Sequence, residues 1–99
     1  MKELTIKEIA KAVHGEIILG DENHKINSVC TDSRLAKKDS LFVPIIGEIH
    51  DGHQFIKSAN ETGATAFFTA RKEAVEGITN ADVILVKDTT IALMELASY

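Results

Sequence analysis

The stretch that decides the fold is Thr31-Asp32-Ser33-Arg34, then Leu41-Phe42-Val43-Pro44-Ile45-Ile46-Gly47, then Asp51-Gly52-His53-Gln54-Phe55-Ile56. An apolar, strand-like run lies between two loops rich in small polar and charged residues, and the second loop opens into a helix. In α/β proteins this order places polar loop ends beside one edge of a sheet, where ligands tend to bind. We therefore predict an α/β fold with a ligand site at that edge.

The segments that follow alternate between strand and helix patterns. Buried strands are predicted at residues 41–45, 64–69 and 83–87, with a helix through Phe55, Ile56 and Ala59 that Gly63 ends, and a short helix at 71–76. Strands joined in this way need right-handed crossovers, which favours a largely parallel or mixed sheet. Pro44 cannot donate to a sheet, so it must lie at an edge or a strand end. The predicted fold is a small three-layer domain with flanking helices.

The N-terminal helix has the clearest signals in the chain. Thr5 and Glu8 have the spacing of a capping box, and Gly15 is placed to end the helix in the left-handed conformation. A strand at 16–19, a turn at 20–23 and a second strand at 26–31 are predicted to follow. One apolar stripe at helical spacing comprises Ile6, Ile9, Ala10 and Val13.

A last helix is predicted after Asp88, Thr89 and Thr90, whose side chains offer N-cap oxygens. No Gly, Asn or Pro stop signal follows it before Tyr99. Two explanations stay open: a terminal helix that frays, or the front piece of a longer protein. Its apolar residues are Ile91, Leu93, Met94, Leu96 and Ala97.

Composition limits the function classes. The 99 residues suit one domain, the formal charge is −4, and no basic cluster is longer than Lys37-Lys38. A nucleic-acid surface would need a concentrated basic patch, and a membrane span about 20 apolar residues in a row, so neither is expected. The single cysteine, Cys30, excludes an internal disulfide and fits a reducing compartment. We expect a cytoplasmic protein of bacterial type.

The first polar loop, Thr31 to Arg34, places two hydroxyls, a carboxylate and a guanidinium within four residues. Such a set can hydrogen-bond a ligand, and the guanidinium can pair bidentately with a phosphate. The alternative is a turn that satisfies itself, with Asp32 or Ser33 bonding nearby N–H groups and Arg34 on the surface. The residue types alone favour this alternative slightly.

The second polar loop, Asp51-Gly52-His53, leads into the helix that carries Phe55. Helix N-termini attract anions, and Gly52 would let a ligand or another backbone segment come close. It is at least as plausible that Asp51 caps the helix and that Gly52 serves only the turn.

The four histidines do not have the spacing of a metal site, so surface or helix-terminal roles are expected for them. They are His14, His24, His50 and His53. A nucleophilic Cys30, with His50 or His53 as base and Asp32 as orienting group, is a weak alternative because nothing places these residues together. Neither Gly-x-x-x-x-Gly-Lys-Ser/Thr nor Gly-x-Gly-x-x-Gly is present, so the chain has no recognisable machinery for nucleotide hydrolysis.

Several motifs follow one another along nearly the whole chain. They are LTIKEIA at 4–10, TDSR at 31–34, DSLFVPI at 39–45, Gly47, DGHQFI at 51–56, Ala59, GATA at 63–66 and VKDTTIAL at 86–93. In this order they resemble the N-terminal domain of the Mur ligases, and within that family the MurF type more than the MurE type. The resemblance implies a three-domain cytoplasmic enzyme of peptidoglycan synthesis, in which the other two domains are the partners of this one.

In such ligases the first domain holds the UDP end of a UDP-MurNAc-peptide, and the central domain binds ATP with magnesium. The substrate carboxylate is activated as an acyl phosphate, which D-alanyl-D-alanine attacks. The resemblance therefore implies no catalytic residue, metal or cofactor in this chain, and weak substrate binding by the chain alone. A MurE-type ligase, which adds the third peptide residue, stays open, as does a stand-alone interaction module.

The resemblance also suggests substrate-binding residues. Thr31 and Ser33 correspond to contacts with the uridine diphosphate, and the segment after Gly47 corresponds to another contact. Asp32, Arg34, Asp51 and His53 belong to the matched motifs with less certain roles. The segment after Gly47 consists of Glu48, Ile49 and His50, and relatives often carry an aromatic residue at the last of these positions.

Overall fold

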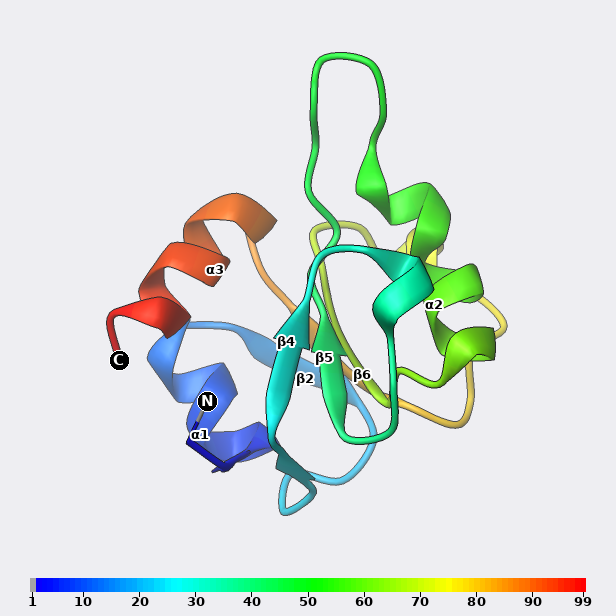
Figure 1. Ribbon diagram of the computed structural model, residues 1–99. Helices are drawn as coiled ribbons and strands as arrows, with labels where there is room; N and C mark the ends of the chain where they lie inside the picture. The colour runs from blue at the N-terminus through cyan, green and yellow to red at the C-terminus, as the bar shows by residue number, and fades with distance from the viewer. Residues whose placement is uncertain (1) are drawn as a thin grey trace.

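The computed structural model describes residues 2–99 (Figure 1). Its centre is a five-stranded sheet in the order β2-β7-β6-β5-β4. Strands β4 to β7 run parallel, and β2 pairs antiparallel with β7 at one edge. This confirms the predicted α/β class with a mixed sheet. The strands are β2 (Glu16–Leu19), β4 (Ser28–Cys30), β5 (Ser40–Phe42), β6 (Ala66–Thr69) and β7 (Asp82–Leu85).

The strand predicted at 26–31 is two strands that belong to different sheets. β3 (Lys25–Ile26) pairs antiparallel with β1 (Leu4–Thr5), whereas β4 pairs with β5. Between them, the Asn27 N–H donates to the Asp39 carbonyl at 3.0 Å. The chain therefore changes partners at Asn27, which explains why this segment lacks a clean alternation.

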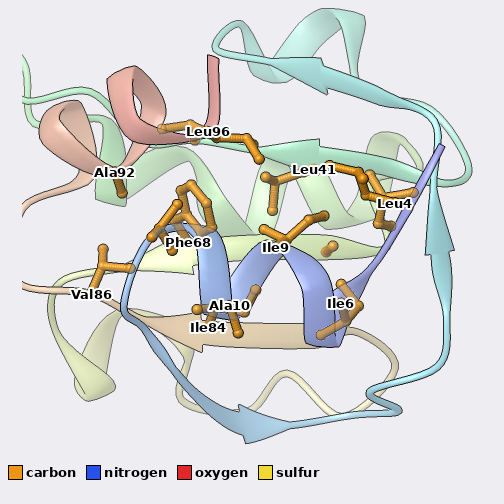
Figure 2. Close-up of a cluster of buried hydrophobic side chains, with 14 residues drawn as sticks. Leu4, Ile6, Ile9, Ala10, Leu41, Phe68, Ile84, Val86, Ala92 and Leu96 are labelled. Carbon is orange, nitrogen blue, oxygen red and sulfur yellow. The ribbon is translucent and has the colours of Figure 1, made fainter. Parts of the chain in front are cut away.

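Helices cover both faces of the sheet and make the three predicted layers. α1 (Ile6–Ala12) and α3 (Thr89–Ala97) lie together on one face, and α2 (Ile56–Thr62) covers the other (Figure 1). Successive side chains of a strand contribute to the cores on the two faces of the sheet. Leu41 points to the α1 and α3 side, and Phe42 points to the α2 side. Figure 2 shows the first core, where Ile9 of α1 lies against side chains of the central strands.

The capping box of α1 is confirmed. The Glu8 N–H donates to Thr5 Oγ1 at 3.1 Å, and the Thr5 N–H donates to Glu8 Oε1 at 3.0 Å. The left-handed residue is His14, with φ 55°, so the prediction of that conformation for Gly15 is wrong. Gly15 is needed for another reason: a Cβ there would lie 2.5 Å from Ile84 Cγ2, so the glycine lets the chain pass close to β7.

The chain enters α2 through a 3₁₀ turn, η2 (Gly52–Phe55), and leaves it at Gly63, with φ 143°. Ile56 and Ala59 face the core as predicted. Phe55 does not: its side chain is 38% exposed, because the tighter turn before the helix moves it off the apolar stripe. The short helix predicted at 71–76 is likewise a 3₁₀ turn, η3 (Lys72–Val75).

α3 begins as predicted, with Asp88 as its N-cap, and is tied to the sheet. The Thr89 hydroxyl donates to the Pro44 carbonyl at 2.5 Å, just beyond the end of β5. Ala92 and Leu96 are buried, whereas Ile91 is 54% and Met94 62% exposed. The predicted apolar stripe of α3 is therefore only partly used by the core. Among the helices of residues 2–99, none has the length and apolar character that a membrane crossing requires.

Candidate functional site

Both polar loops leave the same edge of the sheet. β4 and β5 are parallel neighbours, so the segments after Cys30 and Phe42 emerge at one carboxyl edge, as the sequence predicts (Figure 1). The first loop forms a 3₁₀ turn, η1 (Ser33–Leu35), which packs against α2. β6 also ends at this edge, because it runs parallel to β5, so the segment that begins at Ala70 starts here.

The first loop satisfies its own charges. Asp32 caps η1 by accepting from the Arg34 N–H at 2.9 Å, and its carboxylate holds the Arg34 guanidinium through contacts of 3.0 and 2.8 Å. The side-chain hydrogen bond from Arg34 lowers the pKa of Asp32 to about 2. The self-satisfied turn is thus the arrangement observed, with the Arg34 side chain 86% exposed. Thr31 is exposed and Ser33 half-buried.

The second polar loop, Asp51 to His53, begins on the returning limb of a narrow segment, residues 45–52, which we call the arm; the arm projects from the body of the domain (the green loop in Figure 1). The Gly52 N–H donates to the Ile45 carbonyl at 2.8 Å, and the Gly47 N–H donates to the His50 carbonyl at 2.8 Å. Ile46 and Asp51 form an antiparallel bridge between these bonds. The tip, Gly47 to His50, is exposed and therefore open to a ligand.

Gly52 is explained by the arm itself. A Cβ at Gly52 would lie 2.5 Å from the Ile45 nitrogen and 2.8 Å from its carbonyl oxygen. The glycine therefore lets the two limbs of the arm meet, and the close neighbour is backbone. Asp51 accepts from the His53 N–H at 2.9 Å and so caps η2. The Asp51 carboxylate thus occupies the helix N-terminus, where the sequence suggested that an anion could bind.

His53 ties the base of the arm to the end of β6. Its ring is buried, with Nδ1 2.7 Å from Asp51 Oδ1, and its Nε2 accepts from the Ala70 N–H at 3.0 Å. These partners assign the neutral tautomer with the proton on Nδ1. His53 lies in the first turn of η2, so the expected helix-terminal position is found, but its ring is buried between two loops of the carboxyl edge and does not lie on the surface.

Arg71 is the residue of this site that the sequence reasoning missed. Its Nη1 lies 2.7 Å from Asp51 Oδ2 and its Nε 3.9 Å from Glu73. Burial opposes the charged form of Asp51, but hydrogen bonds from His53 and Arg71 outweigh it and lower the pKa of Asp51 to about 2. The available signal was position, since Arg71 follows the strand predicted at 64–69 and so had to reach the same edge.

An aromatic pair lies beside the arm. The rings of His50 and Phe55 meet edge-on, with centroids 6.3 Å apart, and Phe55 is partly exposed. Ile46 and Ile49 on the arm are exposed too, at 55% and 88%. Apolar and aromatic surface is thus available next to the polar tip, a combination that suits a flat heterocycle with polar substituents.

The arrangement does not support a nucleophilic Cys30. Burial raises the pKa of the Cys30 thiol, which disfavours the reactive thiolate. Both ring nitrogens of His53 are committed to Asp51 and Ala70, and Asp32 is committed to Arg34. Cys30 packs instead against the α2 side of the core. Among residues 2–99, no three His, Cys, Asp or Glu side chains are grouped so that they could hold a metal ion.

The opposite edge of the sheet carries a second histidine network. The two ring nitrogens of His24 contact Asp82 and, at 2.8 Å, Asp39. Asp82 is buried and also accepts from the Asp21 N–H at 2.7 Å. The hydrogen bond to Asp82, helped by that to Asp39, raises the pKa of His24 against the opposing effect of burial. His24 therefore joins three segments at the amino edge, a structural role that the sequence reasoning also missed.

Comparisons with known proteins show the family and the fold to which this chain is similar. Residues 25–98 match the family described as "Mur ligase family, catalytic domain". The UDP-N-acetylmuramoyl-tripeptide–D-alanyl-D-alanine ligase of Bacillus subtilis is 39% identical over 98% of this chain and 21% of the relative. The UDP-N-acetylmuramoyl-L-alanyl-D-glutamate–2,6-diaminopimelate ligase of Clostridioides difficile is 41% identical over 81% of this chain and 16% of the relative.

A crystal structure of MurF from Acinetobacter baumannii has the same fold. It superimposes over the whole of this chain with a TM-score of 0.86 and 24% identity, and the match covers 21% of that protein. The chain thus spans about a fifth of the length of the ligases that it matches. Sequence and fold agree, and the chain belongs to the Mur ligase family.

Proposed function

We propose that this chain is the N-terminal, UDP-binding domain of a cytoplasmic MurF-type ligase, which joins D-alanyl-D-alanine to a UDP-MurNAc-tripeptide. The observation that carries the proposal is the 39% identity over 98% of the chain to a ligase with that name. The position of the polar loops supports it, since both leave one edge of the sheet from neighbouring parallel strands.

The carboxyl edge offers groups that suit a nucleoside diphosphate. The hydroxyls of Thr31 and Ser33 can donate to phosphate oxygens, and the tip of the arm offers the exposed residues Glu48 and His50. The uracil ring would lie on the aromatic and apolar surface of His50 and Phe55. Arg34 and Asp51 are engaged with protein partners, so we assign them to holding the loops in place.

The proposal assigns no ATP or magnesium site to this chain. The sequence has no phosphate loop, and the described residues 2–99 contain no group of three side chains that could hold a metal ion. We therefore place ATP, magnesium and the acyl-phosphate chemistry in the other domains of the ligase. In this proposal, the chain binds and orients the nucleotide end of the substrate, and its partners are the central and C-terminal domains.

Titration of the 99-residue chain with UDP and with UDP-MurNAc-tripeptide, followed by NMR, tests the proposal. We expect amide shifts at Thr31 to Arg34 and at Glu48 to His53, with weak affinity because the chain is net acidic. Ser33→Ala should reduce the shifts in the first loop without changing the fold, and Ser58→Ala, an exposed serine of α2, is the matched control. Shifts confined to other regions would contradict the proposal.

A MurE-type ligase is the second candidate, favoured by the 41% identity to the diaminopimelate ligase of Clostridioides difficile. The two candidates differ in the peptide that the ligase extends. An assay of the ligase that contains this chain, supplied with the dipeptide or the tripeptide form of the UDP-linked substrate, separates them. Turnover of the tripeptide form supports the MurF type, and turnover of the dipeptide form supports the MurE type.

A further inference from the structure

The base of the arm is held from outside the two loops that the sequence singles out. Asp51, on the returning limb of the arm, receives the Arg71 guanidinium at 2.7 Å, while His53 accepts from the Ala70 N–H at 3.0 Å. Both contacts come from the two residues that follow β6. The arm is thus fastened sideways to the neighbouring strand, in addition to its own hairpin bonds.

The segment that holds the arm is itself rigid. Thr69, the last residue of β6, is fully buried, and its hydroxyl donates to the Arg71 carbonyl at 2.6 Å. The Arg71 N–H donates back to the Thr69 hydroxyl at 3.2 Å. Two bonds therefore fix the backbone of Arg71 against the sheet, so its side chain reaches Asp51 from a defined position.

The two fastenings differ in access to solvent. The His53 ring is buried, but the Arg71 side chain is 41% exposed and borders a cavity of about 350 Å³ that is also lined by Gln54 and Lys57. Loss of the buried contact would disturb the fold as well as the arm. Loss of the exposed ion pair removes one support of the arm and leaves the core intact, so Arg71 is the residue through which the arm can be tested alone.

We propose that Arg71 is a positioning residue for substrate binding: through Asp51 it holds the arm so that residues 47–50 meet the UDP-linked substrate. The inference rests on the proposed function, because it assumes that the arm tip contacts that substrate. Arg71 itself stays engaged with Asp51 and acts through it.

The test uses the 99-residue chain and the variants Arg71→Gln and Arg71→Lys. Lys72→Gln, which removes one positive charge from the exposed neighbouring residue, is the matched control. The first measurement is hydrogen exchange of the Gly47 and Gly52 amides, which bond within the arm. The second is the Kd for UDP-MurNAc-tripeptide from NMR titration.

We expect Arg71→Gln to speed exchange of both amides and to weaken binding about fivefold, with the thermal midpoint nearly unchanged. Arg71→Lys should keep the exchange rates and the Kd close to those of the parent chain, because a lysine keeps a positive charge beside Asp51. Lys72→Gln should change neither measurement.

Three results would overturn the inference. If Arg71→Gln leaves exchange and Kd within twofold of the parent chain, Arg71 does not hold the arm. If exchange rises while the Kd is unchanged, the position of the arm does not govern binding. If the parent chain does not bind UDP-MurNAc-tripeptide at all, the proposed function fails, and the inference fails with it. The first two results differ from this one, because in both of them the parent chain binds the substrate.

Discussion

The two edges of the sheet each carry a histidine beside a carboxylate, yet the two histidines are in different states. At the amino edge, His24 has Asp82 on one nitrogen and Asp39 on the other. At the carboxyl edge, His53 has Asp51 on one nitrogen and the Ala70 N–H on the other. Two ionised carboxylates favour a ring with two protons, in line with the raised pKa of His24, whereas one acceptor and one N–H donor favour the neutral ring. The second partner therefore decides the charge.

The two edges are therefore held together by different kinds of interaction. The His24 network pairs a partly exposed ring with two carboxylates and raises the pKa of that ring, so its contribution to stability is expected to depend on pH. The His53 network is a buried pair of hydrogen bonds around a neutral ring, to which Arg71 adds an exposed ion pair. The amino edge is thus joined by charge and the carboxyl edge, which holds the candidate site, mainly by buried hydrogen bonds.

The largest expected effect is that of His53→Ala. The variant removes a buried ring and leaves the Ala70 N–H without its acceptor, so the free energy of unfolding should fall by about 2–4 kcal/mol. Urea unfolding measures the change, and Gln54→Ala, at the exposed neighbouring position, is the control. A loss below about 0.5 kcal/mol would mean that the carboxyl edge does not depend on this ring.

A smaller loss is expected for His24→Ala. At pH 6 the variant removes the partner of two carboxylates, one of them buried, and should cost about 1–2 kcal/mol in the same measurement. His14→Ala, which changes an exposed histidine, should cost much less. Equal losses of unfolding free energy for the two variants would mean that the contacts of His24 with Asp82 and Asp39 do not stabilise the fold.

The pH dependence of stability should separate the edges. The folded pKa of His24 is raised above its ordinary value of 6.5, so its contribution is complete below pH 6.5 and is lost as the pH rises through the folded pKa. His24→Gln should flatten that decline, measured by urea unfolding from pH 6 to about 9. An unchanged slope would contradict the doubly protonated ring.

Acid should act on the other edge. The pKa of Asp51 is lowered from 3.8 to about 2, so its contribution is present above pH 3.8 and is lost as the pH falls through about 2. Asp51→Asn should therefore reduce the loss of stability below pH 4, followed by circular dichroism. A parent chain and a variant with the same acid transition would show that Asp51 does not stabilise this edge.

The smallest effect is expected at the exposed pair of the first loop. Arg34→Ala removes a guanidinium that contacts Asp32 in its own turn and lies almost entirely in solvent. We expect no measurable change in the thermal midpoint. A clear decrease would mean that this turn, like the arm, is fastened to the rest of the molecule.

The elements that the sequence predicts well are those whose signals are local. The capping box of Thr5 and Glu8, the Asp88 cap and the position of Pro44 after a strand are confirmed because each depends on a few neighbouring residues. The buried strand predicted at 41–45 is found at Ser40–Phe42, where Leu41 and Phe42 point to opposite faces of the sheet. The prediction for Gly15 was wrong because a glycine is needed there for the close approach of Ile84, which lies on a strand distant in sequence.

The candidate site was predictable in position and less so in its contacts. Parallel strands force both polar loops to one edge, so their shared location follows from the sequence. The role of His53 depends on Ala70 and that of Asp51 on Arg71, and neither pairing has a local signal. His24 was missed for the same reason, because Asp82 lies on a strand 58 residues away.

The pairing of β2 has a consequence for how the chain acquires its structure during synthesis. In the five-stranded sheet, β2 neighbours β7 alone, with Glu16 opposite Leu85. In a nascent chain that has emerged from the ribosome only as far as residue 80, β7 has not yet been exposed, so β2 has no strand to pair with. The five-stranded sheet can therefore close only after Asp82 to Leu85 have been translated, late in the synthesis of these 99 residues.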